Sequence, residues 1–321
     1  MKGFFLKRSS KAWIGEVMTA TGDYFNFTSM KFIVPVFLLS LFLISCEKDI
    51  DFDLKDTEDV LVVDGSIEAG SAPFIVLTNS FDYYSNLNFD ELSKKFVHDA
   101  IVTITTGQTT YRLKEYAVSG AGIPGLYYYS IDTAAGDNLI GTLDTQYDLE
   151  ITTNGNTYTS STTIPPITKG IDSLWWKQAP FTTDTTKVTV FVRSTDPPGL
   201  GDYIRYFTRT NNGPFFPGAQ SVFDDQLIDG TTYDLRVDPG IDRNDPIPFE
   251  DNFFHRGDTV TLKLSNIDRT SYHFWLTMEF AYQSIGNPFS SPNTVLGNIS
   301  NGALGAFVGY APTVKTLIID P

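Results

Sequence analysis

A single cysteine, Cys46, ends a short apolar run and limits how the rest of the chain can fold. The run covers residues 32–44, is interrupted only by Pro35 and Ser40, and follows Lys31. A basic start, a short apolar middle and a small residue before the cut are the parts of a secretory signal, whereas spanning a bilayer takes about 20 apolar residues. With no second cysteine for a disulfide, the folded part has to be stabilised by an apolar core.

The residues around Cys46 predict lipidation. Residues 43–46 read Leu-Ile-Ser-Cys and resemble the lipobox of bacterial lipoproteins, in which the cysteine becomes the acylated first residue of the mature chain. We therefore predict that residues 30–45 are a signal peptide and that translation starts at Met30, which makes residues 1–29 a gene-start artefact. A long N-terminal region of the signal is the alternative.

The segment after the cysteine indicates the destination. Residues 46–59 are rich in acidic side chains and are predicted to form a solvated tether. Lys48 and Asp49 resemble the export signal that carries lipoproteins of Bacteroidetes to the cell surface. We expect a lipid-anchored protein of the outer membrane that faces the cell surface.

The mature chain carries a strong negative charge. Residues 1–45 contain five basic and two acidic residues, so 18 basic and 36 acidic residues remain in the other 276, with a formal charge of −18. Such a surface repels phosphate backbones and anionic lipid headgroups. We therefore expect no nucleic-acid partner, and we expect attachment to the membrane through the acyl chains alone.

Residues 60–166 contain short strand-like segments with turn residues between them. The segments with this pattern are 60–63, 74–77, 100–105, 147–152 and 157–163. Asn-Gly at 154–155 is a strong hairpin signal, and the prolines at 165–166 end the final strand because proline has no amide hydrogen to pair. One short helix is expected over residues 88–95. The pattern predicts a mainly β chain that starts with an immunoglobulin-like or transthyretin-like β-sandwich.

A second β-rich domain is predicted over residues 170–321. Its strand-like segments are 172–176, 188–192, 203–208, 233–237, 259–264, 306–310 and 314–319. One helix is expected over residues 269–282, with Asp268 as its N-cap and large apolar side chains at helical spacing. Residues 196–199 and 211–218, which are rich in glycine and proline, are expected to be loops.

The order of several short motifs resembles a lipoprotein family of Bacteroidetes, domain of unknown function 4249 (DUF4249). The motifs lie at residues 46–51, 61–65, 147–165, 171–174, 287–289 and 301–305. The resemblance covers nearly the whole mature chain. It implies a surface or outer-membrane lipoprotein, often encoded beside a TonB-dependent outer-membrane receptor. It brings no catalytic residues, because the family has none assigned.

The sequence lacks the motifs of several common enzyme classes. Residues 120–125 fit G-x-G-x-x-G, but a strand-like segment follows them, whereas a dinucleotide site needs a helix there. A serine hydrolase elbow, G-x-S-x-G, is missing, and the histidines lack metal-binding spacing. The three histidines are His98, His255 and His273. We predict no cofactor and no enzymatic activity; a hydrolase would have to use a pair of carboxylates.

Two groups of side chains are candidates for binding. Trp175 and Trp176, with Tyr83 and Tyr84, could form an aromatic platform that stacks on sugars. Core or interdomain packing is the alternative for these four, because strand alternation buries one of two adjacent aromatic residues. The second group is an acidic loop with the oxygen ligands that calcium prefers but without the spacing of an EF-hand. Its members are Asp238, Asp242, Asp245, Glu250 and Asp251.

A lipid anchor, two β domains and the lack of a catalytic set predict a non-enzymatic lipoprotein. We expect it to be an accessory or ligand-binding partner of a TonB-dependent outer-membrane transporter. A glycan-binding or adhesive surface module is the alternative, and exposed aromatic side chains would favour it.

Overall fold

The computed structural model describes residues 59–81, 93–118, 126–243, 253–285, 287, 289, 291 and 293–321. Several residues singled out above lie outside these ranges, namely Cys46, Tyr83, Tyr84, Asp245, Glu250 and Asp251. Most of the helix expected over residues 88–95 also lies outside them. Residues Thr57–Pro321 form one compact unit.

The strands fall into two groups along the chain. The first group is β1 (Leu61–Glu68), β2 (Phe74–Asn79), β3 (Ile101–Thr106), β4 (Thr109–Ala117), β5 (Tyr127–Ile131), the short 3-10 helix η1 (Thr133–Ala135), β6 (Thr145–Thr153) and β7 (Asn156–Ile164). The second is β8 (Ser173–Gln178), β9 (Lys187–Thr195), β10 (Tyr203–Thr210), β11 (Phe216–Phe223), β12 (Thr232–Val237), β13 (Phe254–His255), β14 (Thr259–Ile267), α3 (Arg269–Gln283) and β15 (Leu304–Ile318). The prediction of a mainly β chain is confirmed.

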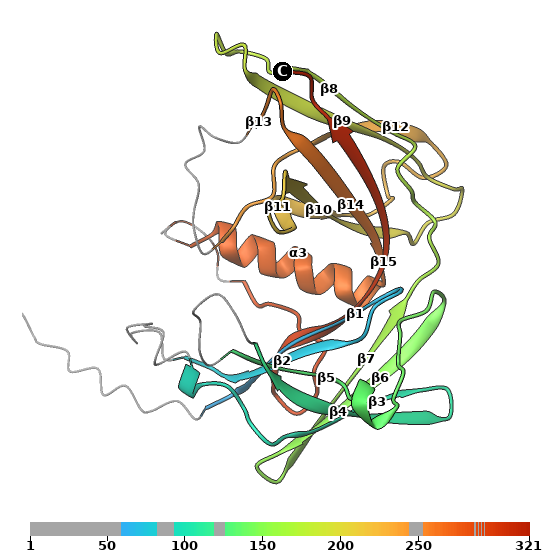
Figure 1. Ribbon diagram of the computed structural model, residues 1–321, viewed down its shortest axis with the longest axis vertical. Helices are drawn as coiled ribbons and strands as arrows, with labels where there is room; N and C mark the ends of the chain where they lie inside the picture. Colours follow the sequence, from blue (N-terminus) through green and yellow to red (C-terminus); the bar gives the residue numbers. More distant parts are fainter. Residues whose placement is uncertain are drawn as a thin grey trace, which may run out of the picture. The chain divides into compact units, whose positions relative to one another are not determined.

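One large sheet runs through both groups (Figure 1). Its strand order is β11-β10-β14-β15-β1-β2-β5-β4-β3-β6-β7; β1 and β15 pair in parallel, and the other neighbours are antiparallel. β4 changes partner along its length, because residues 109–112 pair with β3 and residues 113–117 pair with β5. The sheet therefore folds over a core that includes Ile75, Ile104 and Leu149. We call β1 to β7 and this core the N-terminal lobe.

Alternation along β6 and the turn that follows it produce the predicted hairpin. Tyr147, Leu149 and Ile151 are buried in the core, and the residues between them are exposed. Asn154 and Gly155 both have positive φ angles, 48° and 77°, as a two-residue type I′ turn requires. This turn joins β6 to β7 in the expected register and confirms the prediction.

A second sheet covers one face of β10, β14 and β15 and completes the C-terminal lobe. It contains β12, β9 and β13, with β8 also paired to β9. The core between the two sheets includes Val190 of β9, Ile204 of β10 and Leu262 of β14. The strands predicted over residues 172–264 are confirmed, but the predicted loop at 211–218 is partly wrong. β11 begins inside it, and as an edge strand it tolerates Pro217, which lacks an amide donor.

The predicted helix is confirmed as α3, which packs on β10, β11 and β15 (Figure 1). Its N-cap is Asp268, whose side chain accepts a hydrogen bond from the amide of Ser271 at 2.7 Å. Tyr272 and Phe274 face the sheet, where they meet Tyr310. Within the described ranges, no helix is both long enough and apolar enough to cross a membrane.

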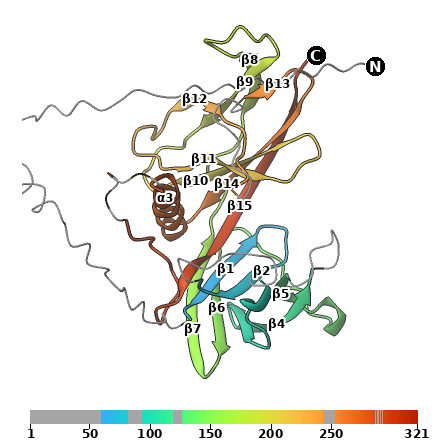
Figure 2. The same ribbon diagram turned by 90° about the vertical axis from the view of Figure 1, so that its left-hand side faces the viewer.

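A single long strand, β15, replaces the two short strands predicted at 306–310 and 314–319. Its first half pairs with β1, and its second half, from Ala311, pairs with β14 (Figure 2). Pro312 falls between these two predicted segments. It lies beyond the last residue that pairs with β1, where a missing amide donor can be tolerated.

The domain boundary predicted near residues 165–170 coincides with the link between β7 and β8. Each lobe has its own apolar core, but β15 contributes to both, because Phe307 packs in one core and Ile319 just beyond the strand packs in the other. Separate folding of the two lobes stays a prediction.

We expect Gly309→Ala to destabilise the protein by about 1–3 kcal/mol, because overpacking at a site that cannot move has a cost of this size. A Cβ at Gly309 would lie 2.7 Å from the carbonyl oxygen of Thr163 in β7, where β15 crosses the N-terminal lobe. Gly170→Ala is the control, since a Cβ there meets nothing within 4 Å. Chemical unfolding followed by circular dichroism measures both variants. Equal stability of the two would contradict the close packing of β15 on β7.

Candidate functional site

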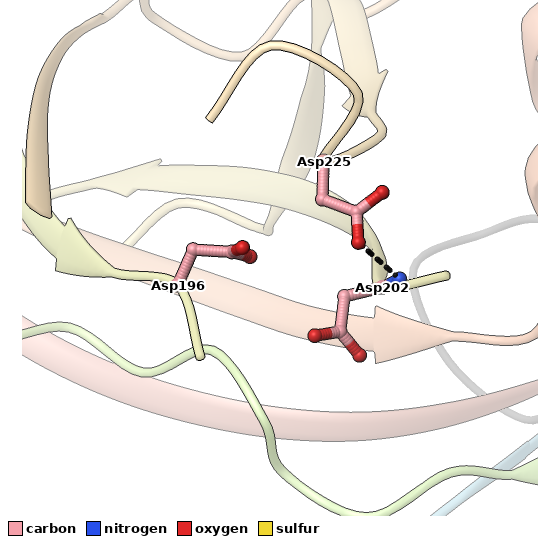
Figure 3. Close-up of side chains that lie close together, drawn as sticks. All are labelled: Asp196, Asp202 and Asp225. Atoms are coloured by element: carbon pink, nitrogen blue, oxygen red, sulfur yellow. Dashed lines mark hydrogen bonds between the residues drawn. The ribbon is translucent and has the colours of Figure 1, made fainter. Parts of the chain in front are cut away.

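Three carboxylates gather where strands of the C-terminal lobe begin or end (Figure 3). Asp196 follows β9, Asp202 precedes β10, and Asp225 lies just beyond β11. One carboxylate oxygen from each residue lies within 4.8 Å of the others. Asp196 and Asp225 are buried and Asp202 is half-buried. Together with Lys169 we call these residues the aspartate–lysine cluster.

Lys169 brings a positive charge into the cluster from the link between the lobes. Its side chain is fully buried, and its Nζ lies 2.6 Å from Oδ1 of Asp196. The same ammonium group donates a hydrogen bond to the carbonyl oxygen of Asp202 at 3.3 Å. A buried ammonium is costly to desolvate unless a carboxylate pairs with it. The ion pair therefore fixes the link against the loops that carry the aspartates.

Asn266 of β14 holds the same link from its other side. The side-chain oxygen of Asn266 accepts a hydrogen bond from the amide of Lys169 at 3.0 Å, and its amide nitrogen donates to the Lys169 carbonyl at 2.9 Å. Thr168 also donates its hydroxyl to Asn266. The link is thus an ordered, internal part of the structure.

Backbone amides satisfy further carboxylate oxygens of the cluster. Gly230 donates its N–H to Asp196 Oδ2 at 3.1 Å. Gly201 and Asp202 donate theirs to Asp225 Oδ2 at 2.7 and 2.9 Å. These hydrogen bonds join the carboxylates to the backbone of the neighbouring loops.

The pKa values of Asp202 and Asp225 are shifted in opposite directions. Burial raises the pKa of Asp202, and the charges of Asp196 and Asp225 add to this effect, although Lys169 opposes it. Burial also acts to raise the pKa of Asp225, but the amide hydrogen bonds from Asp202 and Gly201 outweigh burial and lower that pKa. The structure therefore favours a charged Asp225 beside an Asp202 that takes up a proton more readily.

The donor set fits a buried ion-pair network better than a metal site. Calcium takes six to eight oxygen ligands, and the position beside Asp196 Oδ1 is already held by the ammonium group of Lys169. General acid–base chemistry requires a carboxyl within reach of a substrate. Here Asp196 is 1% exposed and Asp225 is 2% exposed. The cluster is thus better suited to holding the loops that line a neighbouring groove than to catalysis.

The neighbouring groove has a volume of about 840 Å³ and lies beside Asp225 and Gly201. Its lining residues are Pro165, Leu200, Gly201, Tyr203, Asp224, Asp225, Gln226, Ile267, Asp268 and Arg269. Tyr272 donates its hydroxyl to Asp224 at 3.2 Å, and burial together with this carboxylate raises the pKa of Tyr272 to about 12. The groove has the size of a small-ligand site, and its lining combines polar and apolar side chains.

The two predicted tryptophans lie on opposite faces of β8. Trp176 packs against the core of the C-terminal lobe. Trp175 lies on the outer face and stacks on Phe191 of β9, with ring centroids 5.9 Å apart. The guanidinium of Arg193 lies over the Trp175 ring at 5.7 Å, and that of Arg256 lies over Trp176 at 4.7 Å. The structure therefore brings Trp175 together with Phe191 rather than with Trp176.

The other predicted residues do not meet in one site within the described ranges. Asp238 of the acidic loop forms an ion pair with Arg236 at 2.6 Å. His98 contacts Glu115, His255 lies in β13, and His273 lies in α3. The histidines thus occupy separate elements, as their spacing suggested.

Sequence analysis missed the aspartate–lysine cluster. Its members come from the link between the lobes, from the loop between β9 and β10 and from the loop after β11, so no spacing rule connects them. One signal was present, because Asp196 and Asp225 each directly follow a strand-like or apolar segment and a loop rich in Pro and Gly follows Asp196. Such a residue is well placed to accept amide hydrogen bonds from the turn.

Comparison with protein families places the chain beside a family of unknown function. A family model described as domain of unknown function (DUF4249) matches residues 47–316. This range begins one residue after Cys46 and contains the whole aspartate–lysine cluster and every residue of the groove. No curated protein matches the chain.

We expect Lys169→Met to destabilise the protein by about 3–5 kcal/mol, because it leaves the carboxylate of Asp196 buried without its partner. Lys114→Met is the matched control, since Lys114 pairs with Asp132 at 3.2 Å on the surface, where such pairs add little. Urea unfolding of both variants measures the difference. A loss for Lys169→Met no larger than for Lys114→Met would show that the buried pair is not a main support of the loops.

Asp202→Asn and Asp225→Asn should change the pH dependence of stability in opposite ways. The pKa of Asp202 is raised above 3.8 in the folded state. The contribution of Asp202 to stability is therefore lost as the pH rises from 3.8 through the pKa of the folded state. Asp202→Asn removes this loss and should gain on the wild type as the pH rises. The pKa of Asp225 is lowered, so Asp225→Asn should be less stable than the wild type above pH 3.8, with a gap that closes in acid.

Unfolding free energies measured between pH 3 and pH 7 test both variants. Curves for Asp202→Asn and Asp225→Asn that run parallel to each other would contradict the assignment of opposite shifts.

Proposed function

Since the chain belongs to the DUF4249 family, we propose that it is a non-enzymatic lipoprotein, anchored in the outer membrane through Cys46 and facing the cell surface. In this proposal it binds a ligand or partner on behalf of a TonB-dependent outer-membrane transporter. The mature chain starts at Cys46, and the acyl chains on this residue hold it in the bilayer.

The observation that carries the proposal is the place where the family match begins. It starts at residue 47, directly after the cysteine at which the lipobox-like sequence predicts cleavage. The conserved unit described by the family and the expected mature protein therefore start at the same point. This agreement supports a lipidated mature chain.

The groove beside the aspartate–lysine cluster supports binding rather than catalysis. Asp196 and Asp225 are engaged by Lys169 and by backbone amides, so they are poorly placed to exchange protons with a substrate. Polar side chains within a partly apolar lining suit a ligand that is recognised by a few hydrogen bonds as well as by apolar contact. Asp224 and Arg269 supply both an acceptor and a donor there.

Co-purification from outer membranes tests the proposal. We expect the tagged chain, solubilised in mild detergent, to bring down a TonB-dependent receptor that mass spectrometry identifies. A fatty-acid analogue should label the wild type and not Cys46→Ser, because that variant has no thiol to acylate. An unrelated tagged lipoprotein is the control for non-specific recovery.

Two results would contradict the proposal in different parts. Acylation that persists in Cys46→Ser would refute the anchor. Recovery of the labelled wild type without any receptor would refute the partnership with a transporter and leave the anchor in place.

A further inference from the structure

The outer face of α3 and the segment that follows it form an uncharged surface on an acidic protein. Between Arg269 and Lys315 the sequence contains one acidic residue, Glu279, and no lysine or arginine. Glu279 is buried, so it adds no charge to the surface. In the whole chain, by contrast, 19% of residues are charged. A neutral stretch of this length therefore stands out from the rest of the surface.

The outer face of the helix departs from the usual amphipathic arrangement, although Tyr272 and Phe274 pack inward. A surface helix normally turns its apolar side chains inward and its charged side chains outward. In α3 the carboxylate of Glu279 points inward and accepts hydrogen bonds from the amide and hydroxyl of Ser221. Leu276 is 42% exposed and Phe280, one turn later, is 52% exposed. Exposing these apolar side chains to water is unfavourable, so a binding partner that covers them would stabilise the arrangement.

The exposed apolar residues continue from the helix toward the start of β15. The amide of Leu296 donates to Thr277 Oγ1 at 3.0 Å, which places exposed Leu296 beside the middle of α3. Asn298 then exchanges two hydrogen bonds with the backbone of Phe307, so this segment runs along the start of β15. We call the exposed residues along this path the α3 outer patch. Its members are Leu276, Phe280, Ile285, Leu296 and Leu304.

The chain enters the folded unit next to this patch. Val62 of β1 pairs with Leu304 of β15, and the two strands are parallel, so both begin at the same end of the sheet (Figure 2). Residues 47–58 separate Cys46 from the described structure, and such a segment reaches about 40 Å when fully extended. The patch therefore lies within reach of the membrane surface if Cys46 is acylated.

The chemistry of the patch favours a protein over lipid. A helix that lies on a bilayer needs basic residues around its apolar face, and α3 has only Arg269, at its first position. The centre of a protein interface is instead apolar and poor in charge, with an uncharged polar rim. Exposed Gln283, Asn293 and Thr294 supply such a rim here.

We infer that the α3 outer patch docks onto the uncharged, apolar-centred face of an integral protein of the same membrane. The inference rests on the proposed lipid anchor, because the tether limits the partner to proteins of that membrane. A TonB-dependent receptor is the partner that the proposed function supplies, but the patch itself specifies only the chemistry of the face that it binds.

Site-specific crosslinking in the full-length, lipidated protein tests the inference. A photoreactive amino acid at position 280 should crosslink to an integral membrane protein, and the same amino acid at position 227 should not. Leu227 is the matched control, since it is 97% exposed and lies in the loop after β11, outside the α3 outer patch. Phe280→Glu should reduce recovery of the crosslinked partner about tenfold or more, because a charge at an interface centre has a large cost, whereas Leu227→Glu should not.

Several outcomes would overturn the inference. Crosslinks from position 280 only to a second copy of the chain would show self-association. If soluble Cys46→Ser protein binds phosphatidylcholine vesicles, and Phe280→Glu abolishes this binding, the patch contacts lipid. Unchanged recovery of the partner with Phe280→Glu, while thermal unfolding shows an intact fold, would place docking elsewhere. That last result does not affect the proposed function. A crosslink from position 280 to an integral protein other than a receptor would instead support docking through the α3 outer patch and contradict the proposed partnership with a transporter.

Discussion

The buried pair between Lys169 and Asp196 joins the two halves of this protein. Lys169 belongs to the link after β7, and Asp196 belongs to the loop after β9, so the pair ties the exit from one lobe to the loops of the other. Neither side chain is exposed, and separating them would leave two unpaired charges in a poorly solvated interior. The ion pair and the hydrogen bonds to Asn266 therefore fix the link between the lobes. The same cluster holds the loop of Asp225, which lines the groove.

Sequence patterns predicted those elements whose cause is local. The hairpin between β6 and β7 follows from strict alternation and an Asn-Gly turn, and α3 follows from Asp268 and helical spacing. β15 was predicted as two short strands separated by residues 311–313, which include Pro312, and it also contains Gly305 and Gly309. In the structure the two glycines let β15 approach the backbones of Val63 and Thr163 closely. Small residues that permit close packing and small residues that end a strand look the same in a single sequence.

The candidate site could not be predicted because it depends on long-range topology. The aspartates are ordinary loop residues in sequence, and only the meeting of β9, β10 and β11 brings them around an ammonium group. Strand alternation, which the sequence analysis gave as the reason for core packing, places Trp175 and Trp176 on opposite faces of β8. Under α3, Arg205 is buried, and burial lowers its pKa while the hydroxyl of Tyr310 and the ring of Trp275 lie against it. The charges of Arg205 and Glu279 thus lie on the inner side of α3.

The parallel pairing of β1 with β15 also has a consequence for how the chain folds. Val62 pairs with Leu304, so the first strand of the large sheet acquires one of its two neighbours only when the last strand is present. Contacts between residues so far apart in sequence form slowly, because a long loop must close first. A chain threaded from its N-terminus through a membrane would keep this edge of β1 open until the final residues emerged. An open strand edge can pair with other chains, so a chain exported in this way would stay exposed to such pairing until its C-terminal strand arrived.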